Sequence, residues 1–128
     1  MATSSYEKGI EVLGKMVDEE IMNGTINWVK QFSPDIANLI VEFPFGTIYS
    51  RPGLSLQQRS LMTITALITT GASNQLDFHI NGALNVGLTP QEIIEAIIHT
   101  IPYSGFPKAV DAVGVTMKVF KEREITLE

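Results

Sequence analysis

The sequence predicts an all-α protein made of a single domain of several packed helices. Apolar residues recur at helical spacing along most of the 128 residues, and no alternating strand pattern persists for more than a few positions. The hydrophobic content of 45% and the charged content of 18% fit a compact domain and exclude a disordered chain. A chain of this length can bury a core without staples. We therefore expect one all-α domain over residues 1–128.

Seven helical segments are expected, with boundaries set by capping residues, prolines and glycines. They cover about residues 5–23, 25–32, 34–41, 55–70, 74–86, 89–101 and 108–124. Gly24 is the stop signal of the first segment. Ser33 and Pro34, a cap residue followed by a first-turn proline, begin the third.

The glycines and prolines of residues 44–53 predict an irregular loop. Arg51 lies there beside aromatic residues, which makes the loop a candidate pocket rim. The next helix opens at a capping box that begins with Ser55. This helix is apolar nearly all round, so we expect it to be central, and Arg59 is its only charge.

The helix over about residues 74–86 ends at Gly87, a typical stop signal. Thr89 and Glu92 form a second capping box, which opens the sixth segment. Residues 102–107 contain two prolines and a glycine, and they predict a turn before the last helix.

Composition excludes several classes of function. The net charge is −5 with nine basic residues, which argues against nucleic-acid binding because phosphates require a basic patch. The absence of cysteine excludes disulfides, thiolate zinc sites and thiol redox chemistry. No signal-peptide pattern begins the chain, and its apolar runs are too short to span a membrane. A cytoplasmic location is expected.

The mean hydropathy of +0.16 is high for a small monomer, which indicates that another subunit covers some apolar surface. The helix over residues 74–86 has two apolar arcs, Leu76-Ile80-Ala83 and Phe78-Gly82-Val86, and one polar stripe, Asp77-Asn81-Asn85. A domain of this length has difficulty covering both arcs. We therefore expect a closed homo-oligomer with the site near a subunit boundary.

His79 lies on the apolar side of this helix, roughly 160° from the middle of the polar stripe at about 100° per residue. Two interpretations stay open. One is a buried neutral imidazole with both nitrogens satisfied, and the other is a residue that lines a pocket. Position alone favours the buried residue, since a single histidine is a weak site signal.

His99 shares a helix face with Glu92 and Glu95. Surface stabilisation by the Glu95–His99 pair is favoured over a metal site, because metal ligands usually come from several elements. No metal site is therefore expected. Arg59, in an otherwise apolar helix, must meet a carboxylate or a ligand anion, because its charge cannot be titrated away. A structural ion pair and a ligand contact are equally supported.

Five motifs together resemble the carboxymuconolactone decarboxylase family. They are Arg51-Pro-Gly-Leu, Arg59-Ser-Leu-x-Thr, Phe78-His-x-x-Gly-Ala-Leu-Asn-x-Gly, Thr89-Pro-x-Glu-Ile and Tyr103-x-Gly-Phe-Pro. Each motif alone is weak, whereas their combination is specific. The resemblance implies the all-α fold of alkylhydroperoxidase D and an assembly into hexamers or trimers. The redox branch of the family has a Cys-x-x-Cys, at positions that are Ala72 and Gln75 here, so the peroxidase chemistry is absent.

The resemblance also implies a reaction and a set of site residues. Both branches keep a histidine at the position of His79, which makes it the leading catalytic candidate. The decarboxylase substrate is a lactone with a ring carboxylate and an acetate arm. Loss of CO2 sends electrons into the conjugated lactone carbonyl, so no metal or organic cofactor is required. His79, with a pKa near neutrality, is suited to proton delivery.

The remaining candidates would bind the substrate. Arg51 and Arg59 are suited to its carboxylates, because the guanidinium group makes forked hydrogen bonds. Apolar walls are expected from Phe45, Tyr49 and Phe78, and a hydrogen bond to the lactone oxygen from Tyr103. The sequence thus predicts a cofactor-independent decarboxylase acting on a small cyclic carboxylate. The alternative is a non-catalytic small-molecule binding or assembly protein with the same fold.

Overall fold

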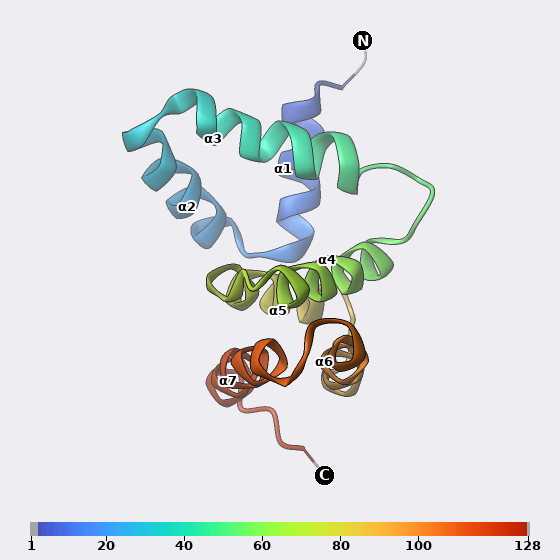
Figure 1. Cartoon of the computed structure of the whole chain (residues 1–128). Helices are drawn as coiled ribbons and strands as arrows, with labels where there is room; N and C mark the ends of the chain where they lie inside the picture. Colours follow the sequence, from blue (N-terminus) through green and yellow to red (C-terminus); the bar gives the residue numbers. More distant parts are fainter. Residues whose placement is uncertain (1–2, 128) are drawn as a thin grey trace. The chain divides into compact units, whose positions relative to one another are not determined.

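The computed structural model describes residues 3–127 and confirms the all-α class, with helices and no strand in that range (Figure 1). The chain divides into two compact units, unit 1 (residues 1–56) and unit 2 (residues 57–128), and each is described by itself. None of the helices between residues 3 and 127 has both the length and the hydropathy to cross a bilayer.

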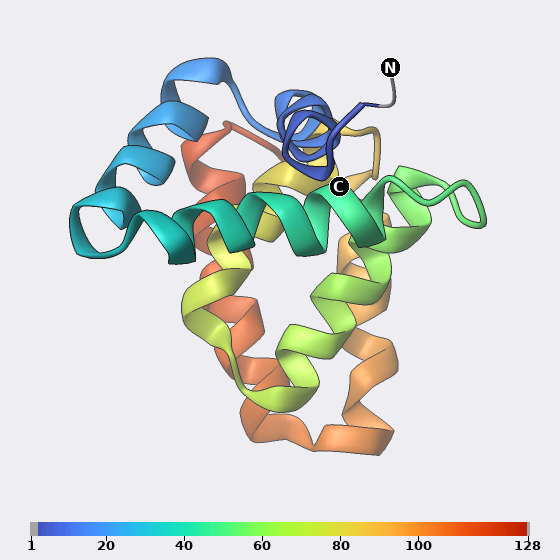
Figure 2. The same cartoon turned by 90° about the horizontal axis from the view of Figure 1, so that it is seen from above.

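Unit 1 consists of three α-helices and a π-helix. They are α1 (Ser5–Met16), α2 (Glu19–Phe32), α3 (Pro34–Ile40) and the π-helix η1 (Val41–Tyr49). Figures 1 and 2 show α3 and η1 as one continuous rod. α1 packs against η1, and α2 packs against α3. The predicted start of α3 is confirmed, since the Ile36 N–H donates to Ser33 Oγ at 3.2 Å.

The expectation of one helix from about residue 5 to 23 is wrong. The backbone is extended at Val17 and Asp18, and the Ile21 N–H donates to Asp18 Oδ1 at 2.9 Å. Asp18 therefore caps a new helix, and Gly24 lies inside that helix. A side-chain cap satisfies a backbone donor that would otherwise lack a partner, and this outweighs the modest cost of a mid-helix glycine.

The loop expected over residues 44–53 is largely a π-helix instead. η1 includes Pro44, and the Thr47 hydroxyl donates to the Glu42 carbonyl five residues earlier at 3.1 Å. In an α-helix the ring of an interior proline clashes with the carbonyl four residues before it. The wider π turn, with bonds to the fifth residue back, accommodates the proline without ending the helix.

Two glycines allow α1 and η1 to approach closely. A Cβ atom on Gly9 would overlap the carbonyl oxygen of Val41, and one on Gly46 would overlap the carbonyl oxygen of Ser5. Both positions are buried. Backbone contact at these two points, the first residue and the middle of η1, fixes α1 against the π-helix.

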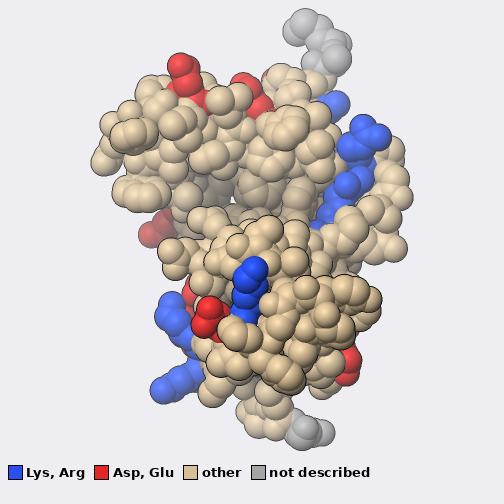
Figure 3. Space-filling view, in the orientation of Figure 1, with Lys and Arg blue, Asp and Glu red and all other residues tan. Residues whose placement is uncertain are grey.

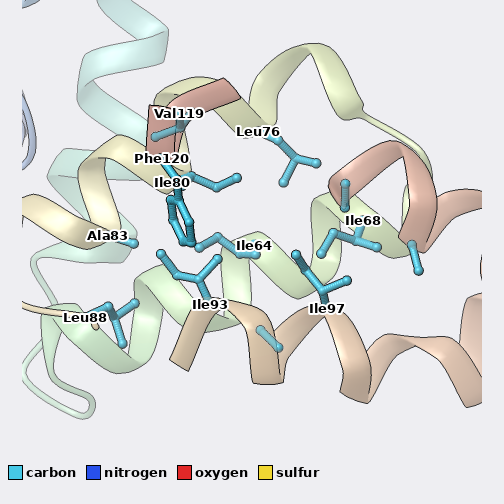
Figure 4. Packing of buried hydrophobic residues seen from close by; sticks show 13 residues of the cluster. Ile64, Ile68, Leu76, Ile80, Ala83, Leu88, Ile93, Ile97, Val119 and Phe120 are labelled. Carbon is cyan, nitrogen blue, oxygen red and sulfur yellow. The ribbon is translucent and has the colours of Figure 1, made fainter. Parts of the chain in front are cut away.

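Unit 2 consists of four α-helices and a short 3₁₀ turn. They are α4 (Leu56–Thr70), η2 (Ser73–Gln75), α5 (Leu76–Asn85), α6 (Pro90–Ser104) and α7 (Phe106–Glu122). All four α-helices supply its core, which is built mainly from aliphatic side chains (Figure 4). Its central members include Ile64, Ile68, Leu76, Ile80, Ile93, Ile97, Val119 and Phe120.

The predicted capping box of α6 is confirmed. The Glu92 N–H donates to Thr89 Oγ1 at 3.1 Å, and the Thr89 N–H donates to Glu92 Oε1 at 2.9 Å. The turn expected over residues 102–107 is wrong, because α6 continues to Ser104 and only Gly105 separates it from α7. Gly105 has φ +86°, a conformation that favours glycine, and it reverses the chain (Figure 2).

α4, expected to be apolar nearly all round and central, supplies Ile64 and Ile68 to the core, and Leu61 and Leu67 pack against that core. Its buried residues are Arg59 and a single stripe, Ser60-Ile64-Ile68, at i, i+4 and i+8. Met62 is exposed on another side of the helix. The threonines at positions 63, 65 and 70 donate their hydroxyl hydrogens to carbonyls three or four residues earlier in α4, so polar groups occupy much of its surface.

α5 is held on both of its sides. Leu76, Ile80 and Ala83 lie in the core. On the polar stripe, Asp77 accepts a hydrogen bond from Lys118 Nζ at 3.2 Å. Arg123, next to the end of α7, makes several bonds to the same stripe, including Nε to Asn81 Oδ1 at 2.6 Å. The stripe therefore faces α7, and the core arc is covered inside unit 2.

The close approach of α1 and η1 yields a prediction about two glycines of one helix. Gly9→Ala should destabilise the protein by about 1–3 kcal/mol, the usual cost of overpacking, because the new methyl group meets backbone. Gly14→Ala is the matched control, since nothing lies within 4 Å of the added Cβ. It should stabilise α1 by about 0.5–1 kcal/mol. Urea denaturation measures both changes, and equal effects at the two positions would contradict the packing.

Candidate functional site

His79 lies on α5 between two core residues, Leu76 and Ile80, and is itself half-buried. Its imidazole contacts the ring of Phe78 edge-on, with ring centroids 5.1 Å apart. Burial lowers the pKa of His79 from 6.5 to about 4, because the charged form loses its hydration. The imidazole is therefore neutral at pH 7.

The expected pKa of His79 near neutrality is thus wrong for the protein without ligand. Its position on the apolar side of α5 was correct, but the size of the shift depends on side chains that distant parts of the chain bring around it. A neutral imidazole can accept a proton or donate an N–H hydrogen bond. It becomes a proton donor to carbon only after it gains a proton, and an anion bound beside it favours that gain.

Arg59 is 9% exposed and lies near the start of α4. It is the only charged side chain among the buried polar residues that the structure describes. The guanidinium group stays charged at all ordinary pH values, and a charge at this depth requires an anionic or strongly hydrogen-bonding environment. The prediction that Arg59 is buried is confirmed. The choice between a structural role and a ligand contact stays open at the level of geometry.

Ser60, the next residue of α4, was missed in the sequence. It is 1% exposed, and within residues 3–127 its hydroxyl has no hydrogen-bond partner. A buried polar group left in this state costs about 1–3 kcal/mol, so it calls for a reason. The sequence does contain a signal for this burial, because Ser60 precedes Ile64 and Ile68 at the i, i+4 and i+8 positions of one helix face. A bound ligand or an ordered water is the usual partner of such a group.

The three candidates of unit 1 lie in η1 or shortly after it. Phe45 is buried, and its ring packs against Tyr49 with centroids 5.2 Å apart. Tyr49 is half-buried and lines a cavity of about 300 Å³ with residues of α1. Arg51 is exposed, and its backbone N–H donates to the Ile48 carbonyl at 3.1 Å. An aromatic pair and a cavity therefore occupy the segment predicted as a pocket rim.

Tyr103 lies apart from His79 in unit 2. It is 76% exposed on the last turn of α6, and its ring lies 5.7 Å from that of His99. Glu95, on the same helix face as His99, accepts a hydrogen bond from Gln91 Nε2 at 3.4 Å. Across residues 3–127, no three His, Asp or Glu side chains come close enough to hold a metal ion.

The structure thus distributes the predicted residues between the two units. Unit 2 contains Phe78, His79 and Arg59 as buried or half-buried residues, with Tyr103 on the surface. Unit 1 contains Phe45 in the middle of η1, Tyr49 as its last residue and Arg51 two residues later.

Comparison with known proteins identifies the family. A model of the carboxymuconolactone decarboxylase family matches residues 34–118, a range that includes every site residue predicted from the sequence. The chain belongs to the carboxymuconolactone decarboxylase family. The resemblance drawn from the five motifs is therefore confirmed.

Three relatives are similar over most of the chain. The 4-carboxymuconolactone decarboxylase of Acinetobacter baylyi is 34% identical over 123 residues, which cover 96% of this chain and 92% of the relative. The nitrosuccinic acid decarboxylase of Metarhizium robertsii is 34% identical over 117 residues, 91% of this chain and 82% of the relative. An uncharacterised 15.0 kDa protein of Paracoccus denitrificans is 31% identical over 98 residues, 75% of this chain and 73% of the relative.

The low pKa of His79 predicts a specific dependence of stability on pH. Between pH 6.5 and about 4 the unfolded chain binds a proton on His79 that the folded protein does not, so stability falls as the pH is lowered through this window. The loss amounts to up to about 3 kcal/mol. His79→Gln should remove this part of the pH dependence, as measured by urea denaturation between pH 4.5 and 7.

The matched control is His99→Gln, which removes an exposed histidine from α6. This variant should keep the pH dependence of the unmodified protein. Because carboxylates titrate equally in all three proteins, the difference between the curves isolates His79. Identical curves for His79→Gln and the unmodified protein would show that the folded state does not hold the imidazole neutral.

Proposed function

We propose that this protein is a cofactor-independent decarboxylase that acts on a small cyclic carboxylate of the lactone type. The observation that carries the proposal is the buried imidazole of His79 in a chain that is similar, over nearly its whole length, to two proteins named as decarboxylases. The alternative is a small-molecule binding or assembly protein that has kept the fold without the reaction.

The names of the two relatives suggest the chemical class of substrate. One refers to a lactone with a ring carboxylate and the other to a dicarboxylic acid with a nitro group. When CO2 leaves, the electron pair of the broken C–C bond needs an acceptor, and a conjugated lactone carbonyl and a nitro group both serve. We therefore infer that the substrate of this protein is a carboxylate. The carbon that loses CO2 is conjugated with, or bonded to, an electron-withdrawing group.

The proposed reaction has two chemical steps. In the first, the C–C bond to the carboxylate breaks, CO2 leaves, and the electron pair moves to the lactone carbonyl oxygen to give a dienolate. In the second, the pair returns to carbon and forms a C–H bond with a proton, so one proton is consumed per CO2 released. His79 delivers this proton and is reprotonated from solvent.

His79 is neutral in the protein without ligand, so the two reaction steps require that substrate binding protonates it. The substrate is an anion, and a negative charge near an imidazole raises its pKa. Binding would then load His79 with the proton used in the second step. Arg59 is the residue of unit 2 that we assign to a substrate carboxylate, because a guanidinium group supplies a forked pair of hydrogen bonds. Phe78 would form an apolar wall beside His79.

Four further residues stay candidates for substrate binding. Phe45, Tyr49 and Arg51 of unit 1 combine an aromatic pair with a cationic side chain near a cavity. Tyr103 is an exposed phenol on α6 and would need a substrate or a neighbouring subunit to approach it.

An assay of CO2 release tests the reaction. The protein should decarboxylate 4-carboxymuconolactone in preference to the acyclic nitrosuccinate, and His79→Ala should lower kcat by about 10²-fold or more, the usual contribution of general acid catalysis. Gln91→Ala, an exposed position of α6, is the control and should keep full activity. Binding of both compounds without turnover would favour the binding-protein alternative. Turnover that survives His79→Ala unchanged would remove His79 from the mechanism.

We also propose that the protein works as a homo-oligomer, with a hexamer or a trimer as the form that the family suggests. The support comes from α6 and α7, which border an apolar groove of about 390 Å³. Its exposed members include Ile98, Phe106, Val110, Val113, Met117 and Leu127. Figure 3 shows uncharged surface beside a basic and an acidic group on the front of unit 2. This groove thus adds exposed apolar surface to the half-buried Phe78 of α5 and Val86 directly after it.

The spacing along α7 suits a second helix. Phe106, Val110, Val113 and Met117 are separated by four, three and four residues, the spacing of positions that form a helix–helix seam. A stable interface buries roughly 800 Å² per partner, and the exposed groove residues supply apolar area for such a contact. α2 and α3 expose further apolar side chains, among them Trp28 and Phe32. Two such surfaces would supply the two kinds of contact in a hexamer built from two trimers.

Light scattering at micromolar concentration tests the assembly. The unmodified protein should be a stable oligomer, and the double variant Val110→Lys/Met117→Lys should dissociate it, because two charges cannot be buried in an apolar seam. Gln91→Lys adds the same charge to the exposed face of α6 and should leave the oligomer intact. A monomer in the unmodified protein, or an oligomer that tolerates the double variant, would refute this interface.

A further inference from the structure

Unit 1 contains a cavity that the proposed proton transfer at His79 does not require. Its volume is about 300 Å³, and it lies where α1 packs against the end of η1. α1 contributes Lys8, Glu11, Val12 and Lys15 to its lining, and η1 with the residue after it contributes Tyr49 and Ser50. The backbone contacts at Gly9 and Gly46 fix α1 against η1, and these two helices carry most of the residues that line the cavity.

The charges around the cavity favour an anion. Lys8 and Lys15 are seven residues apart, which places them two turns apart on the same face of α1. Glu11 is the single acidic residue of the lining. Within the described part of the chain, neither lysine forms an ion pair with Glu11 or with any other acid. The two ammonium groups are therefore available to a ligand, and the net charge of the lining is positive.

The remaining lining residues favour an organic ligand over an inorganic one. Val12 is buried and Leu56 is half-buried, and both give the cavity an apolar surface. The ring of Tyr49 is held by its contact with the buried Phe45, 5.2 Å between centroids. Ser50 donates its hydroxyl hydrogen to the Gly46 carbonyl, so it contributes only an acceptor. A ligand with a carboxylate head and a small apolar body matches two lysines and this mixed polar and apolar lining.

We propose that the α1–η1 cavity is a binding site for a small organic carboxylate. Lys8 and Lys15 bind the carboxylate, the apolar residues contact the body of the ligand, and Glu11 weakens the binding by repulsion. Two sources supply this chemistry. One is the substrate of the proposed decarboxylase, and the other is a separate carboxylate that binds whether or not the protein is a decarboxylase. Binding is measured without turnover, so this proposal and the proposed function can fail separately.

Calorimetric titration of the full-length protein with phenylacetate and with acetate tests the site. Phenylacetate should bind more tightly than acetate, because its ring reaches the apolar walls. Lys8→Met/Lys15→Met should lower the affinity for phenylacetate by roughly tenfold or more, since two charge-assisted hydrogen bonds are lost. Glu11→Gln should raise the affinity several-fold. Lys30→Met, which removes a cation from α2 outside the lining, should leave it unchanged.

Kinetics then distinguish the two sources. If the site receives the substrate, phenylacetate should inhibit turnover competitively, and the double lysine variant should raise KM with little change in kcat. If the site is separate, phenylacetate should bind equally well to a substrate-saturated protein, and KM should be unaffected. Equal phenylacetate affinity in the unmodified protein and the double variant would overturn the proposal, as would a loss of affinity in Glu11→Gln. Circular dichroism establishes that each variant is folded.

Discussion

The orientation of α5 is the constraint on which the rest of unit 2 depends. Three of its apolar residues lie in the core, and its opposite stripe of Asp77, Asn81 and Asn85 is bonded to Lys118 and Arg123 of the last helix and its end. Rotation about the helix axis would expose the first set and break the second. Packing and hydrogen bonds together therefore determine the rotation of α5 about its axis. This rotation also fixes the side on which the His79 imidazole lies.

This constraint links stability to chemistry at one residue. An imidazole held in a desolvated place is costly to charge, which lowers its pKa and makes the folded state less stable in acid. The same environment strengthens any interaction with an anion, because opposite charges attract more strongly where water is excluded. A protein that binds a carboxylate there gains a proton donor only when the ligand is present. Protonation of the free protein, and with it the loss of stability, is avoided at neutral pH.

Unit 1 depends on a different physical feature, the contact of backbone with backbone. Gly9 and Gly46 remove side chains where α1 meets η1, and the π-helix accommodates Pro44 while it continues the line of α3. The result is a rigid pair of helices with a cavity at one end. Lys8 and Lys15, at i and i+7 of α1, line this cavity and are exposed. In unit 2, by contrast, Arg59 is buried and His79 is half-buried.

Local chemistry in the sequence determined a large part of this structure. The helical class, the starts of α3 and α6, the end of α5 and the apolar-side position of His79 all follow from caps, prolines, glycines and periodicity within a few residues. The break at Asp18 was also encoded, but a nearby glycine gave a competing signal, and the π-helix was hidden by a proline that normally ends helices.

Only the tertiary structure decided the properties that depend on distant residues. The desolvation of His79, the burial of Ser60 without a partner, the bonding of the α5 stripe to α7 and the exposed groove between α6 and α7 each require segments far apart in the chain. The cavity beside Lys8 and Lys15 likewise exists only because η1 returns to α1. Sequence periodicity assigns a residue to a face of its own helix, whereas burial, pKa and cavities depend on what covers that face.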